Sequence, residues 1–177
     1  MIYVVEGLDR CGKSSFIDVL RSNIKNPNIL VIHSGKPPKG VNTSIWSTDY
    51  YDSLIKHSLS LSILENYNII LDRSWIGETV YGPIYRNDNI GLNRLEHEMH
   101  DYTEHFKLIT FIDSAENALS REDGNSLSES ISNKIKEINS FKEAHNLSRI
   151  TNKMLIDWSK ETFNKDFLID LSNKVTK

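Results

Sequence analysis

The chain has 177 residues, ordinary proportions of apolar and charged side chains and a net charge of −3, which is typical of one globular domain with its own core. It contains no run of about 18 apolar residues, and a strand pattern follows Met1 directly, so we expect neither a membrane segment nor a targeting segment. The single cysteine, Cys11, excludes an internal disulfide and suits a reducing cytoplasm. No long block of Lys and Arg is present, which argues against broad electrostatic binding to long nucleic acid.

The first predicted strand, over residues 2–5, leads into a glycine-rich loop with the P-loop pattern G-x-x-x-x-G-K-S. A helix should follow, because apolar residues recur at helical spacing at Phe16, Ile17, Leu20 and Ile24. Gly7 and Gly12 let the backbone approach a polyphosphate closely, and the loop N–H groups and the helix N-terminus attract that anion. We therefore expect bound ATP, with Lys13 reaching its β- and γ-phosphates and Ser14 holding Mg²⁺.

Strand and helix patterns alternate along the rest of the chain. Further strands are predicted over 29–33, 68–72, 107–113 and 153–158. Helices are predicted from Ser47 or Thr48 to about 66, over 92–106, from 131 to about 145 and over 163–175. Ser114 is a plausible N-cap, and Gly82-Pro83 should break the aromatic-rich segment 72–86. The alternation indicates an α/β fold of the P-loop NTPase class, with a five-stranded parallel sheet of order 2-3-1-4-5 flanked by helices on both faces.

A second polar motif, Asp72-Arg73, ends the third predicted strand. The carboxyl ends of parallel strands lie at one edge of the sheet, so this motif should lie beside the P-loop. Asp72 could orient the Mg²⁺ shell or the attacking hydroxyl, or it could simply cap a helix. Arg73 could clamp an acceptor phosphate with two hydrogen bonds, or make a surface ion pair of little energetic value. Arg86 is a further candidate for a phosphate clamp.

These motifs together resemble a known family. Residues 6–15, EGLDRCGKSS, resemble the E-G-x-D-R-x-G-K-S-[ST] loop of the thymidylate kinases. Asp72-Arg73 with Tyr81 is similar to that family's D-R-Y-x-x-S-S-x-A-Y-Q segment, and residues 111–121 are similar to its fourth-strand region. The stretch 80–86, VYGPIYR, also resembles phage-encoded relatives, which would place the protein in the cytoplasm of a host cell.

The resemblance implies a kinase that uses ATP and Mg²⁺, formed by one P-loop kinase domain over 1–177 with a short lid loop at about 121–128. It implies a small-molecule nucleotide acceptor, and a homodimer by analogy with the family. Catalysis would depend on Lys13, Arg10, Asp72 and Arg73, with Arg10 stabilising charge from inside the P-loop. ATP would be bound by Gly7, Asp9, Gly12, Lys13, Ser14, Ser15 and Arg121, and the metal by Ser14 and Asp72. The acceptor would be bound by Asp9, Lys36, Arg73, Glu78, Tyr81 and Arg86.

The chain departs from the family on the acceptor side. The family's glutamine, which helps to read thymine, is Gly82 here, and its paired serines are Gly77 and Glu78. Lys36 could replace an arginine of the family's second-strand loop only as a point charge, without the bidentate fork. The kinase chemistry therefore carries over better than specificity for dTMP.

Other functions remain open at this point. The acceptor could be a deoxynucleoside or a hydroxymethyl-pyrimidine within DNA, although the acidic net charge counts against DNA. A nucleotide-dependent switch ranks lower, because residues 152–155, NKML, lack the aspartate of the guanine-reading N-K-x-D motif. Cys11 could be redox-sensitive at a helix N-terminus, or simply a small residue that fits there. The aromatic residues Trp46, Tyr50, Tyr51, Trp75 and Tyr85 could stack on a base or pack in the core. His97, His100, Asp101 and His105 are interpreted as a solvated helix face rather than a metal site.

Overall fold

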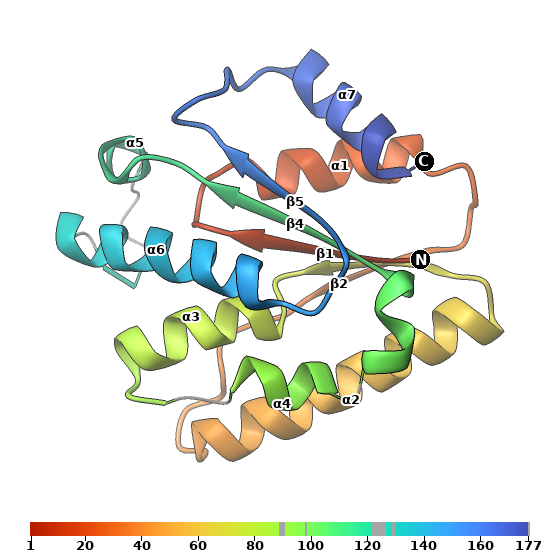
Figure 1. Ribbon diagram of the computed structural model, residues 1–177, viewed down its shortest axis with the longest axis horizontal. Helices are drawn as coiled ribbons and strands as arrows, with labels where there is room; N and C mark the ends of the chain where they lie inside the picture. The colour runs from red at the N-terminus through yellow and green to blue at the C-terminus, as the bar shows by residue number, and fades with distance from the viewer. Residues whose placement is uncertain (89–90, 98, 122–126, 129, 177) are drawn as a thin grey trace.

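The computed structural model describes residues 1–88, 91–97, 99–121, 127–128 and 130–176. Its five strands are β1 (Ile2–Gly7), β2 (Ile29–His33), β3 (Asn68–Asp72), β4 (Phe106–Ile112) and β5 (Asn152–Asp157). All of them pair in parallel, in the order β2-β3-β1-β4-β5. The predicted strand order is confirmed, and all carboxyl ends lie at one edge of the sheet (Figure 1).

Helices cover both faces of this sheet, as predicted. Helices α1 (Lys13–Asn23) and α7 (Lys165–Thr176) pack together on one face (Figure 1). The other face carries α2 (Thr43–Leu64), α3 (Trp75–Tyr85), α4 (Leu92–His97) and α6 (Ile131–Leu147) (Figure 1). The short helix α5 (Ala115–Ser120) follows β4, and a 3₁₀-helix, η1 (His100–His105), precedes β4. Within the residues described, no helix has both the length and the apolar character needed to span a bilayer.

The core lies between the central strands and the two helical layers. Every residue of β1 and β4 is buried, whereas the edge strands β2 and β5 are only partly covered. Central parallel strands are covered on both faces, which explains their nearly continuous apolar sequences. Phe16 of α1 packs on Phe111 of β4 with ring centroids 5.3 Å apart, and Trp158 stacks on the same ring at 6.0 Å. These contacts hold the start of α1 against the end of β4, where the P-loop lies.

Two predicted helices have different bounds in the structure. Helix α2 begins at Thr43, because the Asn42 side chain caps it by accepting a hydrogen bond from the N–H of Ile45 at 3.1 Å. The predicted cap Ser47 is fully buried inside the helix. The single helix expected over 92–106 is instead α4 and η1, with residue 98 outside the described part. The chain must be extended by Phe106, since this residue pairs with Ile2 in the sheet.

The predicted break at Gly82-Pro83 is also wrong, because α3 continues through it to Tyr85. Pro83 lacks only its own N–H donor, and the N–H of Arg86 still bonds the Gly82 carbonyl at 2.9 Å. The N-cap role of Ser114 is confirmed: its hydroxyl accepts from the N–H of Asn117 at 3.1 Å. Strand β5 and helices α6 and α7 lie within about two residues of their predicted ranges.

Candidate functional site

The P-loop has the left-handed backbone that its glycines suggested. Gly7 has φ 128° and Gly12 has φ 78°, and a Cβ on Gly7 would lie 1.8 Å from the Phe111 carbonyl oxygen. Only glycine fits at that position. Lys13 is buried, and its ammonium donates to the carbonyls of Gly7 at 2.8 Å and Leu8 at 2.5 Å. Burial lowers the pKa of Lys13, and the nearby Asp9 carboxylate opposes that shift.

A cavity of about 420 Å³, which we call the P-loop pocket, lies in front of this loop. It is lined by the predicted catalytic residues Arg10 and Arg73 and by the predicted ATP and metal residues Asp9, Gly12, Lys13, Ser14, Ser15, Asp72 and Arg121. Two further lining residues, His33 and Phe163, were not among the predicted site residues. The predicted ATP residue Gly7 lines the second pocket described below instead. His33 pairs with Asp72 in the β2–β3 register, and its Nδ1 lies 2.8 Å from Asp72 Oδ2. Strand register, which the sequence pattern does not give, would have been needed to find that contact.

Two arginines lie at the mouth of the P-loop pocket on different elements. Arg10 has φ 61°, and its Nη1 donates to the Arg121 carbonyl at 2.8 Å. Arg121 in turn forms an ion pair with the buried carboxylate of Asp113 at the end of β4. Its Nη2 also lies 4.0 Å from the sulfur of Cys11. The predicted ATP-binding Arg121 is therefore held directly beside the P-loop.

The thiol of Cys11 does not have the lowered pKa that a redox-sensitive cysteine needs. Burial raises the pKa of Cys11 to about 11, although Lys13 and Arg121 oppose this. A protonated thiol is a poor nucleophile, so this environment favours the alternative that Cys11 is a small residue that fits there. Cys11 is a small buried residue whose carbonyl accepts from Trp158 Nε1 at 2.7 Å.

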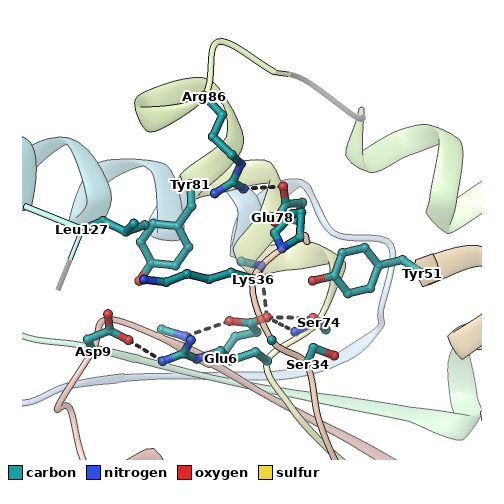
Figure 2. A pocket seen from close by; sticks show the side chains of 15 residues that line it. Glu6, Asp9, Ser34, Lys36, Tyr51, Ser74, Glu78, Tyr81, Arg86 and Leu127 are labelled. Atoms are coloured by element: carbon teal, nitrogen blue, oxygen red, sulfur yellow. Dashed lines mark hydrogen bonds and ion pairs between the residues drawn. The ribbon is translucent and has the colours of Figure 1, made fainter. Parts of the chain in front are cut away.

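A second pocket opens on the other side of the P-loop, between the segment after β2 and helix α3 (Figure 2). It brings together all six predicted acceptor residues: Asp9, Lys36, Arg73, Glu78, Tyr81 and Arg86. Ion pairs lie at its two ends. Asp9 lies at one end, and Arg86 pairs with Glu78 at the other (Figure 2). Arg73 Nη2 is 2.9 Å from Asp9 Oδ1.

Asp9 and Arg73 line both pockets, so their ion pair forms a shared wall. Arg73 has φ 69°, an unusual backbone for a residue with a side chain. Its N–H donates to the Val5 carbonyl at 3.1 Å, which ties the residue to the end of β1. Strained backbone of this kind persists where the surroundings determine it strongly, and it is often found at functional sites.

Glu6 forms the floor of the second pocket and was not predicted from the sequence. It is 1% exposed and accepts hydrogen bonds from Ser74 Oγ at 2.9 Å, from the N–H of Gly77 at 3.0 Å and from the N–H of Ser74. Burial raises the pKa of Glu6, and these donors oppose the shift. The carboxylate thus joins the end of β1 to the first turn of α3.

This arrangement explains two departures from the thymidylate kinase pattern. A Cβ on Gly77 would lie 2.9 Å from Glu6 Oε2, so a serine there would collide with the hydrogen-bonded carboxylate. A Cβ on Gly82 would lie 2.8 Å from the Asp88 carbonyl oxygen. The thymine-reading glutamine therefore has no space at residue 82 unless the backbone moves.

Several aromatic candidates have structural roles. Trp75 is fully buried, packs edge-on against Phe106 and donates to Glu96 at 3.2 Å. Trp46 stacks on Tyr50 with ring centroids 4.8 Å apart, and neither lines the second pocket. The hydroxyl of Tyr85 donates to Glu137 of α6. Tyr51 does line the pocket and is 3% exposed. Among the described residues, no cluster of three His, Cys, Asp or Glu could hold a metal ion.

Comparison with known proteins supports the resemblance read from the motifs. No family model matches the chain. It is 36% identical over 86 residues to the "Putative thymidylate kinase" of Acidianus bottle-shaped virus (isolate Italy/Pozzuoli). That alignment covers 49% of this chain and 50% of the viral protein, so the match spans about half the length of each.

Solved structures share the fold over nearly the full chain. YorR from Bacillus subtilis, solved in complex with phosphorylated GDP, has a TM-score of 0.65 at 13% identity and covers 99% of this chain and 93% of its own. Thymidylate kinase from Ehrlichia chaffeensis has a TM-score of 0.63 at 13% identity, and the match covers 100% of this chain and 98% of the Ehrlichia protein. Deoxyadenosine kinase from M. mycoides with bound dATP has a TM-score of 0.55 at 16% identity and covers both chains fully. The fold is therefore that of P-loop nucleotide and deoxynucleoside kinases.

Proposed function

We propose that this chain is an ATP-dependent phosphotransferase that moves the γ-phosphoryl group of ATP to a deoxynucleoside monophosphate. The observation that carries the proposal is the wall shared by the two pockets. The Asp9–Arg73 pair lines both the P-loop pocket and the second pocket, so groups bound on either side would meet at this wall. Phosphoryl transfer needs donor and acceptor in such close, fixed positions.

The residues of the P-loop pocket fit a bound triphosphate. The loop backbone is left-handed at Gly7, Arg10 and Gly12, which presents N–H groups toward an anion. The exposed Ser14 and Ser15 stand at the N-terminus of α1, where the helix dipole also favours negative charge. The ammonium of Lys13, which now donates to two loop carbonyls, would instead donate to the β- and γ-phosphates.

Magnesium would be held by Ser14 and Asp72, which both line the P-loop pocket. Mg²⁺ is usually bound by one or two protein oxygens, with phosphates and water completing its shell, and this donor set suits it. The ion would neutralise the phosphate charge that develops during transfer.

The remaining roles follow from the positions of the arginines and acids. Arg10, carried in the P-loop, would stabilise the charge of the transferring group, and Arg73 would hold the acceptor phosphate. Asp9 would contact the acceptor sugar, with Tyr81, Lys36, Glu78 and Arg86 around the rest of the acceptor. A monophosphate acceptor needs no strong base, so Asp72 would orient rather than take up a proton.

The relatives support this class of reaction. The matched viral protein is named as a thymidylate kinase, and the structural neighbours include thymidylate and deoxyadenosine kinases. A homodimer and a cytoplasmic location belong to the proposal by resemblance alone. The proposed lid at about 121–128 lies mostly outside the part of the chain that the structure describes. The lid residues that are described are Arg121, Leu127 and Ser128.

A transfer screen with γ-labelled ATP tests the proposal. The acceptors are the deoxynucleoside monophosphates, the free deoxynucleosides and duplex DNA containing 5-hydroxymethyluracil. We expect label on a monophosphate. Label on DNA only, or on nucleosides only, would replace the proposed acceptor class. Binding of ATP without transfer to any acceptor would overturn the proposal of a kinase.

A further inference from the structure

The base end of the second pocket is built differently from its phosphate end. Figure 2 shows Glu78 and Arg86 on one side of Lys36 and Asp9 on the other. Asp9 is the ion-pair partner of Arg73. If Arg73 holds the acceptor phosphate, as the proposed function requires, the acceptor base lies toward Glu78 and Arg86. The following inference therefore rests on the proposed function.

Two buried polar atoms of this pocket's lining residues have no hydrogen-bond partner among the residues that the structure describes. Nε of Arg86 belongs to the base end, whereas the hydroxyl of Tyr81 points toward Lys36 and Asp9 (Figure 2). Burial raises the pKa of Tyr81, so its hydroxyl stays protonated. A buried polar atom without a partner costs free energy, which a bound ligand would recover by pairing with it. The rings of Tyr51 and Tyr81 flank Glu78 on two sides and offer surfaces for a base (Figure 2).

The ion pair presents a simple hydrogen-bonding pattern. An ionised Glu78 offers only acceptors, and Arg86 offers only donors. The two side chains are in contact, so one block of acceptors lies beside one block of donors. A base edge matches this pattern when its own donors and acceptors are also separated into two blocks.

Three of the bases have such an edge. Cytosine presents its amino group beside N3 and O2, adenine presents its amino group beside N1, and guanine presents O6 beside N1–H and its amino group. Thymine and uracil present an alternating edge of carbonyl, N–H and carbonyl. Against Glu78 and Arg86, one of those carbonyls would face the carboxylate, which repels it.

We propose that Glu78 and Arg86 read the acceptor base and select one that carries an exocyclic amino group, so that cytosine, adenine or guanine is preferred to thymine or uracil. The close approach of Asp88 to Gly82, which excludes the thymine-reading glutamine, fits a pocket rebuilt in this direction. Because 5-hydroxymethyluracil has the same alternating edge as thymine, the inference also disfavours the DNA acceptor.

Matched ligands test this without altering the protein. Titration calorimetry of the full chain compares dCMP with dUMP, dAMP with dIMP, and dGMP with dIMP. In the first two pairs a carbonyl and a ring N–H replace the amino group and the neighbouring ring nitrogen, and in the third pair hydrogen replaces the amino group. We expect at least one amino-bearing member to bind about tenfold tighter than its partner and tighter than dTMP. Tightest binding of dTMP or dUMP, equal binding within all three pairs, or no binding at millimolar concentration would overturn the inference.

The variant Glu78→Gln then assigns the preference to this side chain. Its amide offers an NH2 group that donates and a carbonyl oxygen that accepts, so it can meet an alternating edge, and we expect the preference within the pair to fall at least about fivefold. Glu143→Gln, on the exposed side of α6, is the matched control and should keep the preference. An unchanged preference in a folded Glu78→Gln variant would contradict the inference, and if that variant does not fold, Arg86→Gln applies the same criterion.

The two proposals can fail separately. Transfer to dTMP in preference to the amino-bearing monophosphates would overturn the base assignment and leave the kinase standing. Selective binding of amino-bearing monophosphates without any transfer from ATP would do the opposite.

Discussion

At the scale of single residues, the site depends on a few side chains that close contacts with neighbouring residues hold in place. Glu6 accepts hydrogen bonds from Ser74 and Gly77, and this packing requires glycine at residue 77. Arg73 adopts φ 69° at the end of β3, where its side chain meets Asp9. The shape of the acceptor side is therefore set by contacts that begin at the end of β1.

Lys13 and Arg73 should be separable by their effects on ATP binding. Both Lys13→Ala and Arg73→Ala should abolish phosphoryl transfer. Lys13→Ala should also weaken ATP binding roughly 10- to 100-fold, because it removes a charged donor to the phosphates. Arg73→Ala should leave ATP affinity nearly unchanged, since its proposed partner is the acceptor. Calorimetry and the transfer assay measure these effects, with the exposed Lys25→Ala as a control. An equal loss of ATP affinity in both variants would contradict the role given to Arg73.

At the scale of elements, short helices place charged groups at the carboxyl edge of the sheet. Helix α5 begins at its N-cap Ser114 and ends beside Arg121. Asp113, which precedes it, accepts from the side chain of Asn117 at 2.9 Å and pairs with Arg121. This one-and-a-half-turn helix thus holds Arg121 against the P-loop.

The cap of α5 should be worth a measurable part of the stability. Ser114→Ala removes a hydrogen bond to the N–H of Asn117 and should lower the free energy of unfolding by about 1 kcal/mol. Ser130→Ala is a matched control, because Ser130 stands at the N-cap of α6 without a side-chain cap bond. Urea unfolding followed by circular dichroism gives both values. Equal losses in the two variants would show that the cap hydrogen bond contributes little.

At the scale of the whole molecule, buried polar contacts join the helical layer to the sheet. His145 of α6 lies 2.9 Å from the hydroxyl of Thr110 in β4, and burial lowers the pKa of His145 to about 4. On the same face, Glu96 accepts from Trp75 and from Ser148 at 2.7 Å, which links α4 to α3 and to the end of α6. Helix α6 is therefore bound to the sheet by polar as well as apolar contacts.

The His145 contact predicts a specific loss of stability in acid. The unfolded chain takes up a proton on this histidine with a pKa near 6.5, whereas the folded chain takes it up only near 4. Stability from this group is therefore complete above pH 6.5 and decreases as the pH falls toward 4, by about 2 kcal/mol between pH 7 and 5. His145→Gln should show a correspondingly smaller decrease, while the exposed His57→Gln should behave as the wild type. Urea midpoints at several pH values test this, and parallel curves for wild type and His145→Gln would contradict it.

The sequence by itself determined the features that depend on neighbouring residues. The P-loop, the five strands, their parallel order and the N-cap at Ser114 were all predicted, because apolar periodicity, glycine spacing and capping are local signals. Local signals were less reliable at element ends. Asn42, and not Ser47, caps α2, and α3 continues through Pro83. The sequence pattern does not show which of several capping residues is used, or that a helix tolerates the loss of one N–H donor.

Only the tertiary structure decided how the site residues are paired. The contacts Asp9–Arg73 and Glu6–Ser74 join residues more than sixty positions apart, and His33–Asp72 depends on the β2–β3 register. The sequence named Glu78 and Arg86 as separate candidates, but their ion pair forms because two turns of α3 bring both side chains to one end of the pocket. Such contacts depend on the packing of β1, β2, β3 and α3 around a common edge, and no local stretch of sequence contains that information.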